Sequence, residues 1–495
     1  MVEGSTSTAP GQEAGRRGLP RTGTPGRRRG RLAAAGAVCL LACVPAPGAA
    51  SVSRTTPSPD PEQPSPHVTP THPDWTRTAR LYQLNTRQFT SEGTFRAAMA
   101  HLPRIRALGA DIVWLMPVHP IGEVNRKGTL GSPYAVKDYY GVNPELWTLT
   151  DLRAFVDTAH DLGLRVILDW VANHTAWDNV LVEEHPEWYE RDGKGAFRPT
   201  PWCDWTDIID LDYGQPGLRR YMADAMAWWV KEVDVDGFRC DVAGFVPVDF
   251  WNRVRAELDA LKPVFMLAEW EARDLHDAAF DATYAWSWNE AMHRIAMGEA
   301  DVSSLHVYYS GNESAWPAEA MRLTFVSNHD KNAWEGTQFQ RFGDALEAAI
   351  ALSVVGDGMP LLYGGQEAGN PRRLAFFDKD PIEWRDHPVG DLYRRLFALK
   401  GALTALGNAP WGAPMIRVPN DDEHGVLSFV RRNEVDGVFA VFNLSAASRE
   451  VAFRDTLHHG TWVDAFGGEV VEVDDATRLA MDPWGWRVLA QGAGR

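Results

Sequence analysis

The sequence has few cysteines, and they do not cluster. Of the four in 495 residues, Cys39 and Cys43 lie near the N-terminus, which leaves only Cys203 and Cys240 for the rest of the chain. Two distant cysteines exclude a disulfide framework and give no spacing typical of a metal site. We expect two buried thiols here, with a single Cys203–Cys240 disulfide as the alternative.

Positive charge is also scarce, since the net charge at pH 7 is -17. Proteins that bind nucleic acid neutralise phosphates with Lys and Arg. The charge balance therefore argues against a nucleic-acid partner and favours a neutral substrate. Tryptophan, in contrast, is abundant, with 21 residues. Flat aromatic faces bind sugar rings, so this excess favours a carbohydrate ligand.

The apolar stretch near the N-terminus is short. Residues 32–44 follow four arginines between positions 27 and 31, and small residues lie at 48–50. Such a stretch is too short for a comfortable membrane span, and the pattern predicts an export signal over residues 1–50. It is either a signal peptide cleaved near Ala50 or a lipoprotein signal that leaves a lipid anchor at Cys43. Both alternatives place the protein outside the cytoplasm, where it is secreted, periplasmic or lipid-anchored. Residues 51–73 are rich in Pro, Ser and Thr and predict an extended linker.

From about residue 74, short apolar runs alternate with amphipathic, helix-like stretches. Alternating strands and helices predict a parallel sheet, and eight such units favour a closed (β/α)8 barrel over residues 74–405. The expected strands are residues 80–84, 110–116, 164–169, 235–240, 263–268, 280–284, 321–327 and 359–363. The clearest expected helices are residues 94–108, 151–162, 217–233, 249–261 and 344–355.

Two regions depart from this alternation. Residues 175–215 follow the third expected strand, contain several aromatic residues and show little periodicity, so they predict a short inserted domain beside the active site. Residues 406–495 contain short strand-like runs separated by turns, which predict a C-terminal antiparallel β-sandwich domain.

Four segments place a carboxylate at or just after an apolar run. In a (β/α)8 barrel, polar groups at the C-terminal ends of the strands form the active site. The segments are Arg165-Val-Ile-Leu-Asp-Trp-Val-Ala-Asn-His174, Gly237-Phe-Arg-Cys-Asp241, Phe265-Met-Leu-Ala-Glu269 and Thr324-Phe-Val-Ser-Asn-His-Asp330. Together and in this order they resemble the α-amylase family of retaining α-glucoside hydrolases. The resemblance covers roughly residues 78 to 490.

Retaining glycoside hydrolysis uses one carboxylate as nucleophile and a second carboxyl group as acid and base. We assign these roles to Asp241 and Glu269, and expect their carboxyl groups to lie roughly 5–5.5 Å apart. Arg239 points to the same face of its strand as Asp241, so we expect its charge to lower the pKa of Asp241 and keep it ionised. Cys240 points the other way, into the core.

The resemblance implies further site residues. Asp330 is the third catalytic carboxylate, and the residues that contact the sugar are Tyr134, Asp169, His174, Arg239 and His329. The family also implies a calcium ion held through Asn173 and Asp210, which carry the oxygen ligands that calcium prefers.

The predicted function is hydrolysis of α-1,4-glucosidic bonds in starch or maltooligosaccharides, by a monomer. The same residues are compatible with a transglycosylase or isomerase, or with an enzyme acting on α-1,6 bonds or cyclodextrins. A binding protein with a dead barrel is the alternative from another class. Such a protein would be expected to have lost catalytic carboxylates, and all three are present here.

Overall fold

The computed structural model describes residues 70–201 and 203–492. The predicted export signal, the lipid anchor at Cys43 and most of the predicted linker lie outside these residues. Among the helices that are described, none is long and apolar enough to cross a membrane. The end of the predicted linker is packed rather than extended: His72 is buried and its Nδ1 lies 2.6 Å from Oδ1 of Asp281. Composition alone could not reveal this contact, because it depends on a distant carboxylate.

Eight parallel strands form a closed barrel in the order β1-β10-β9-β8-β7-β6-β3-β2, which confirms the predicted fold. One strand lies in each predicted apolar run: β1 (Leu81–Leu84), β2 (Ile112–Leu115), β3 (Arg165–Trp170), β6 (Gly237–Cys240), β7 (Phe265–Ala268), β8 (Ala282–Tyr284), β9 (Met321–Phe325) and β10 (Met359–Tyr363).

Both faces of the barrel strands are buried, which explains why the runs are continuously apolar. Leu81 and Phe265 belong to the cluster inside the barrel. Tyr82 and Met266, the next residue in each case, belong to the cluster between the strands and the helices.

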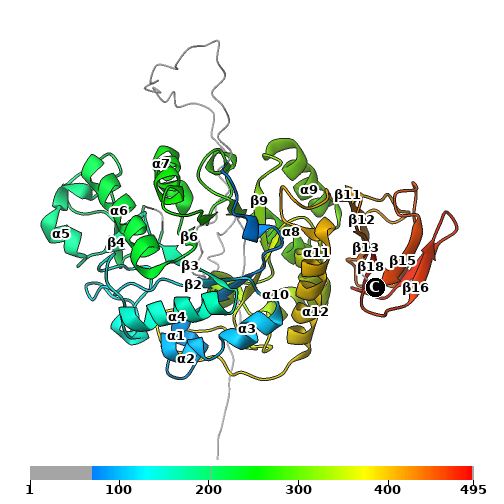
Figure 1. The fold of residues 1–495 in the computed structure, drawn as a ribbon, viewed down its shortest axis with the longest axis horizontal. Coiled ribbons are helices and arrows are strands. Elements are labelled where there is room, and N and C mark those ends of the chain that lie inside the picture. Colours follow the sequence, from blue (N-terminus) through cyan, green and yellow to red (C-terminus); the bar gives the residue numbers. More distant parts are fainter. Residues whose placement is uncertain (1–69, 202, 493–495) are drawn as a thin grey trace, which may run out of the picture. The chain divides into compact units, whose positions relative to one another are not determined.

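Most of the helices lie outside the barrel strands (Figure 1). They are α1 (Thr86–Phe89), α2 (Phe95–Met99), α3 (Leu102–Leu108), α4 (Leu149–Asp161), α5 (Val180–Glu184), α6 (Pro216–Val233), α7 (Val248–Asp259), α8 (Trp286–Ala296), α9 (Ser303–Ala315), α10 (Gln338–Phe342), α11 (Leu346–Val355) and α12 (Pro388–Ala402). The helix predicted over residues 94–108 is in fact two, α2 and α3. Pro103 lies in the first turn of α3. A proline there loses no hydrogen bond, because the first N–H groups of a helix have no partner within it, but it could not continue the preceding helix.

The stretch after β3 forms the predicted insertion. It contains α5 and a two-stranded antiparallel sheet of β4 (His174–Ala176) and β5 (Ile208–Asp210). In this sheet His174 is paired with Asp210. The end of the insertion therefore pairs with its beginning, which lies four residues after the end of β3.

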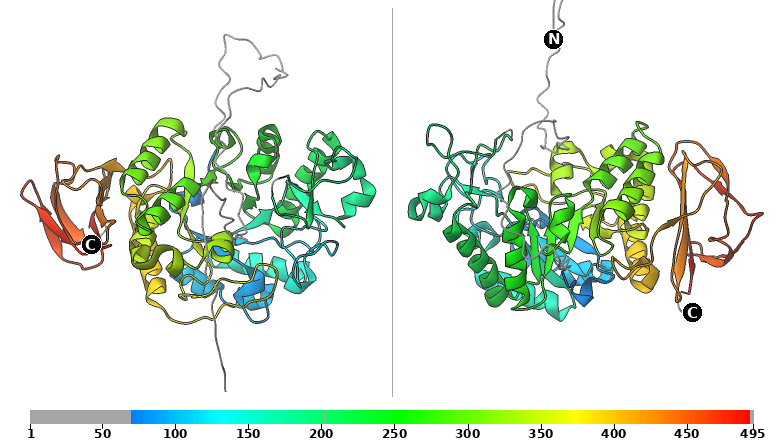
Figure 2. Two further views of the ribbon diagram at one scale, coloured as in Figure 1. Left: turned by 180° about the vertical axis from the view of Figure 1, so that it is seen from behind. Right: turned by 90° about the horizontal axis from the view of Figure 1, so that it is seen from above.

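The C-terminal residues form the predicted antiparallel domain, drawn in orange to red in Figure 2. Its larger sheet consists of β11 (Ile416–Arg417), β12 (Val426–Arg432), β13 (Gly437–Asn443), β18 (Trp486–Gln491), β15 (Gly460–Asp464) and β16 (Val470–Val473), and its smaller sheet of β14 (Arg449–Ala452) and β17 (Arg478–Met481). Along β13, Phe439 and Val441 enter the core of this domain, whereas Val438 and Ala440 belong to the same cluster as the barrel helices. One face of the larger sheet thus covers part of the barrel domain.

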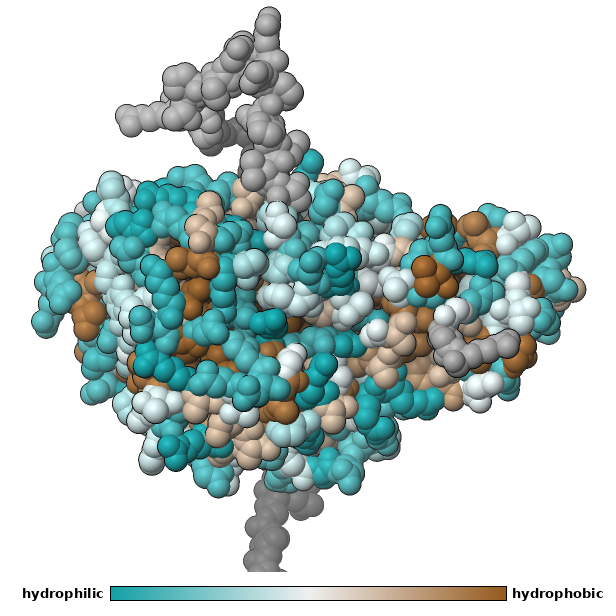
Figure 3. All heavy atoms as spheres, in the orientation of Figure 1, coloured by the Kyte–Doolittle hydropathy of each residue, from teal (hydrophilic) through white to brown (hydrophobic). Residues whose placement is uncertain are grey.

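The face of the molecule in Figure 3 is mostly hydrophilic, with apolar residues in separate groups. The most exposed large apolar side chains, Val307, Val435 and Val470, come from α9, the β12–β13 turn and β16.

Candidate active site

The predicted site residues lie at the C-terminal ends of the barrel strands. Asp169 lies within β3 and Arg239 within β6, while Asp241 and Glu269 directly follow β6 and β7. All eight strands are parallel, so these ends meet at one mouth of the barrel. The structure therefore brings together residues that are up to a hundred positions apart in the sequence.

Arg239 is the centre of this site. Its side chain is fully buried, and Nη1 donates to Oδ1 of Asp169 and to Oδ1 of Asp241, both at 2.8 Å. Nη2 lies 2.9 Å from Oε1 of Glu269. One guanidinium thus contacts three carboxylates. Arg239 and Asp241 lie on the same side of the strand, as the alternation of side chains predicts.

The pKa values differ from the sequence-based expectation. Burial raises the pKa of Asp241 to about 7, although Arg239 pulls it down. Burial likewise raises the pKa of Glu269 to about 8 and that of Asp169 to about 6. The expectation that Arg239 lowers the pKa of Asp241 overall was wrong, because one charge is shared among three desolvated carboxylates. The pKa values of all three carboxyl groups are therefore raised by burial.

A strained backbone links the two central carboxylates. Val242 has φ 36° and ψ 48°, a left-handed conformation that is costly for a β-branched residue. In this conformation its N–H donates to Oε2 of Glu269 at 2.9 Å. This hydrogen bond holds the carboxyl group of Glu269 against the backbone that directly follows Asp241.

A hydrogen-bonded chain connects His329 to Asp169. Gln83 Nε2 donates to His329 Nδ1 at 2.7 Å, so His329 Nε2 carries the proton and donates to the Tyr134 hydroxyl at 2.7 Å. That hydroxyl donates in turn to Oδ2 of Asp169 at 3.1 Å. Burial lowers the pKa of His329 to about 4, which keeps the ring neutral.

The remaining predicted residues also lie at the mouth. Asp330 Oδ2 lies 3.3 Å from His329 Nε2, and Asp241 Oδ2 lies 3.9 Å from His174 Nε2. Burial lowers the pKa of His174 to about 4. Cys240 is buried in the outer core as predicted, and burial raises the pKa of its thiol well above the usual value. It is therefore not a nucleophile.

Sequence reasoning missed three residues of this site, one of which is Tyr284, whose hydroxyl accepts from Arg239 Nε at 3.3 Å. Trp114 donates through Nε1 to Oδ2 of Asp169 at 3.1 Å, and Gln83 fixes the tautomer of His329. Gln83 could have been found, because it is a polar residue within the apolar run of β1. Trp114 carries no such signal, since a large apolar residue is expected in a barrel strand.

Asn173 and Asp210 come together, but as a hydrogen-bonded pair. Asn173 Nδ2 lies 3.4 Å from Oδ1 of Asp210, which also accepts from the Thr200 hydroxyl, and Arg198 Nη2 lies 4.0 Å from Oδ2. Among residues 70–201 and 203–492, no group of three or more His, Cys, Asp or Glu is placed to hold a metal. As they lie, these residues offer Asp210 hydrogen-bond donors and not the six or more oxygen ligands that calcium requires. The resemblance-based calcium ion therefore stays a prediction.

The fold and the site together define a (β/α)8-barrel enzyme whose mouth carries paired carboxylates. Residues 79–301 match the model of the α-amylase catalytic domain, and residues 416–488 match that of the maltogenic amylase C-terminal domain. An α-amylase from Lactobacillus plantarum has a solved structure that is 32% identical, with a TM-score of 0.76. The match covers 84% of this chain and 99% of that chain. The chain belongs to the α-amylase family of glycoside hydrolases and transferases.

Curated relatives are more diverse in activity. Alpha-amylase MalA of Haloarcula japonica is 27% identical over 392 residues, which is 76% of this chain and 56% of that protein. An alpha-1,4-glucan:maltose-1-phosphate maltosyltransferase of Rhodospirillum rubrum is 32% identical over 280 residues, which is 50% of this chain and 39% of that protein. The chain thus spans about half or less of the length of these curated relatives.

Proposed function

We propose that this protein is a retaining α-glucan hydrolase that cleaves α-1,4-glucosidic bonds in starch or maltooligosaccharides. The observation that carries the proposal is the contact of one buried arginine, Arg239, with both Asp241 and Glu269 at the mouth of the barrel. This reaction requires two neighbouring carboxyl groups, one as nucleophile and one as acid and base.

In the proposed mechanism, Asp241 attacks the anomeric carbon. One of its oxygens is held by Arg239, so Oδ2 is the oxygen available for attack. As the glycosidic C–O bond breaks, Glu269 gives its proton to the leaving oxygen, and a covalent glycosyl-enzyme remains. Water then attacks the same carbon, Glu269 takes its proton, and Asp241 is released.

The other residues of the mouth would bind and orient the sugar. Tyr134 presents a ring that is held by His329 and Asp169, and we assign it to stacking against the sugar at the cleavage point. Asp330 and His329 would accept from and donate to sugar hydroxyls. Asp169 and His174 would do the same from the β3 side. Sugar hydroxyls need such partners because their own water is lost on binding.

Product analysis tests the reaction. The protein would be incubated with soluble starch, maltoheptaose, pullulan and cyclodextrin, and the anomer released first would be identified by NMR. We expect short maltooligosaccharides from starch and maltoheptaose, released first as the α-anomer. Release of the β-anomer would contradict the retaining mechanism. Action confined to pullulan or cyclodextrin would instead support an α-1,6- or cyclodextrin-acting enzyme.

The alternative is a transglycosylase or isomerase that uses the same residues. The observation in its favour is the similarity to maltosyltransferases. In that case a sugar hydroxyl replaces water in the second step, so adding an acceptor sugar distinguishes the two. Longer or rearranged oligosaccharides without new reducing ends would support the transferase.

A further inference from the structure

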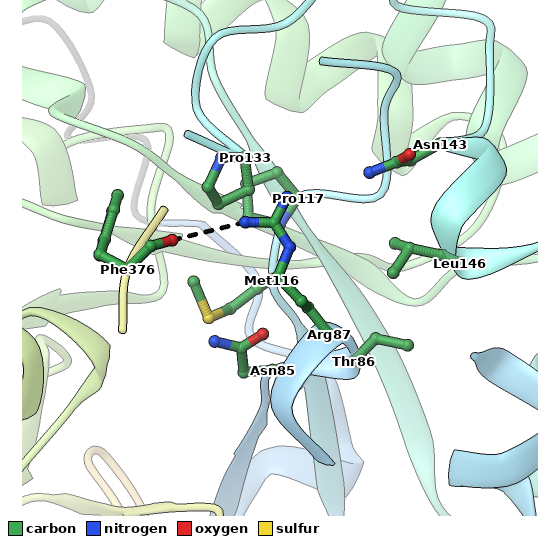
Figure 4. Close-up of a pocket in the computed structure, with 9 residues that line it drawn as sticks. All are labelled: Asn85, Thr86, Arg87, Met116, Pro117, Pro133, Asn143, Leu146 and Phe376. Atoms are coloured by element: carbon green, nitrogen blue, oxygen red, sulfur yellow. Dashed lines mark hydrogen bonds between the residues drawn. The ribbon is translucent and has the colours of Figure 1, made fainter. Parts of the chain in front are cut away.

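A buried arginine outside the carboxylate cluster joins two loops at the mouth of the barrel. Arg87 lies in α1, directly after β1, and is 7% exposed. Its Nη1 donates to the carbonyl of Gly131 at 2.9 Å and, more weakly, to that of Phe376 at 3.4 Å. Figure 4 shows the guanidinium facing the carbonyl of Phe376, with the second of these bonds drawn as a dashed line. Gly131 belongs to the loop after β2 and Phe376 to the loop after β10.

Further contacts hold the same two loops together. Leu130 N–H donates to the carbonyl of Phe377 at 3.0 Å, and Thr129 N–H donates to Oδ1 of Asp378 at 2.8 Å. Gly128 has φ +63°, and a Cβ there would lie 2.5 Å from Cβ of Phe377. The loops therefore approach closely along several residues, and Arg87 closes the buried end of this seam.

The two loops carry aromatic rings that reach the catalytic centre. Tyr134 and Phe376 are stacked with ring centroids 6.1 Å apart and an angle of 16° between their planes. Tyr134 is also stacked on His329 at 5.5 Å and 18°. The ring centroids of Phe376 and His329 lie 6.3 Å apart, so the three rings form a cluster, and the donation of Tyr134 to Asp169 joins this cluster to the carboxylate site. A shift between the loops would separate Phe376 from Tyr134.

The space around Arg87 is too small to be a sugar site of its own. The cavity has a volume of about 20 Å³ and is lined by Asn85, Thr86, Arg87, Met116, Pro117, Pro133, Asn143, Leu146 and Phe376. That volume is enough for about one water molecule. The carboxylate of Glu145, with Oε2 3.3 Å from Arg87 Nη2, supplies the opposite charge. Arg87 thus acts on loops, not directly on a ligand.

We propose that Arg87 is a positioning residue that holds the Tyr134–Phe376 stack in register for a glucosyl ring of the substrate. This inference rests on the proposed function, because it assigns the stack to glucan binding. Arg87 fixes the position of two loops that carry substrate-binding groups. A small displacement of such groups weakens substrate binding.

The test compares Arg87→Met and Arg87→Lys with Arg126→Met. Arg126 is the matched control because it lies in the same loop as Gly131, and its hydrogen bonds among the described residues go to carbonyls of that loop, those of Gly122 at 2.8 Å and Ile121 at 3.1 Å. The dissociation constant of maltoheptaose would be measured by calorimetry in a Glu269→Gln background, and KM and kcat in the active enzyme. We expect Arg87→Met to raise both Kd and KM about ten-fold, with kcat changed less than about two-fold and Arg126→Met close to the parent.

Arg87→Lys keeps the charge, but its Nζ ends one bond short of Nη1, the atom that contacts both loops, so we expect part of the same loss. If Arg87 only supports the fold, the variants lose active molecules and apparent kcat while Kd and KM stay unchanged, and the inference is wrong. If the parent turns over no glucan, the proposed function fails. The maltoheptaose Kd then still tests the role of Arg87: a raised Kd in Arg87→Met supports it, and an unchanged Kd contradicts it. Absence of any maltoheptaose binding by the parent would overturn both.

A double-mutant cycle gives the sharpest discrimination. With Phe376→Ala already in place, the stack is gone, so adding Arg87→Met should raise Kd less than about two-fold further. Fully additive effects would mean that Arg87 acts independently of the stack and would overturn the proposal. Should Arg87→Met fail to fold, the same cycle with Arg87→Lys provides the measurement.

Discussion

Two buried arginines contact carboxylates at opposite ends of the barrel strands. The pKa of the carboxylates is raised at one end and lowered at the other. Arg239, at the C-terminal ends, contacts three carboxylates whose pKa values are all raised. Arg255, at the other end, contacts Asp281 at 2.7 Å, and Asp281 also accepts from His72 and from the backbone N–H of Met266. There the paired charges and donors outweigh burial, and the pKa of Asp281 is lowered.

The contrast shows what separates a structural ion pair from a reactive one. Both sites are buried, and both combine Arg with Asp. At Asp281 the donors around the carboxylate are sufficient for its negative charge, so its ionised form is stabilised. Around Arg239 negative charge exceeds what the donors compensate, so protons are held near neutral pH, where they can be transferred.

The largest effect that should separate the two sites is on catalysis. We expect Asp241→Asn to lower kcat by about four orders of magnitude, because the amide cannot attack the anomeric carbon. Asp281→Asn should leave kcat per folded molecule near that of the parent. The measurement is maltoheptaose hydrolysis, normalised to the folded fraction by circular dichroism. Near-normal turnover by Asp241→Asn would remove the assigned nucleophile.

The stability of the fold should be lowered more by Asp281→Asn than by Asp241→Asn. Replacing Asp281 removes the more buried of the two carboxylates that pair with Arg255, the other being Asp259, so we expect Asp281→Asn to lower the free energy of unfolding by about 3 kcal/mol. The raised pKa of Asp241 means that ionising it costs folded-state stability as pH rises from about 4 through about 7. Asp241→Asn removes that cost, so at pH 7 it should be at least as stable as the parent. Urea unfolding at pH 7 measures both, and equal losses in the two variants would contradict the comparison.

The pH dependence of catalysis should differ from that of fold stability. For kcat/KM, protonation of Asp241 should give an acidic limb near pH 7 and deprotonation of Glu269 a basic limb near pH 8, with the two values belonging to the coupled pair. For Asp281 the lowered pKa contributes stability that is present above its unfolded pKa and lost as pH falls through the folded value. Activity should therefore decline near neutral pH before the fold is lost in acid. A pH–rate profile with limbs only below pH 5 would argue against the raised pKa values.

Much of the barrel could be predicted because its strands are buried on both faces. The eight continuous apolar runs are unambiguous for that reason, and parallel strands then bring Asp169, Asp241 and Glu269 to one mouth. Helix boundaries were less certain, since the break between α2 and α3 depends on Pro103. The apolar periodicity of the sequence continues from α2 into α3, so it does not show where one helix ends and the next begins.

The parts that could not be predicted depend on contacts between loops and on the degree of burial. Nothing local to Arg87 or Phe376 indicates that they meet, because the contact is made only when the barrel closes. The sign of the net pKa shift at Asp241 was missed for a related reason. A sequence shows that Arg239 is near but not that two further carboxylates share it.

The smallest expected effect concerns calcium, and it extends the comparison to a third carboxylate. Asp210 shares a feature with each of the other two: burial raises its pKa, as at Asp241, but its oxygens face the Thr200 hydroxyl, the Asn173 amide and Arg198, as those of Asp281 face donors. A calcium ion would have to displace these donors and would gain fewer oxygen ligands than it needs. We therefore expect millimolar calcium after EDTA treatment to shift the thermal midpoint by less than about 1 °C, since a ligand stabilises only as far as its concentration exceeds its Kd. A calcium-dependent rise of several degrees, abolished by Asp210→Asn, would show instead that Asp210 and Asn173 rearrange into a metal site as the resemblance implies.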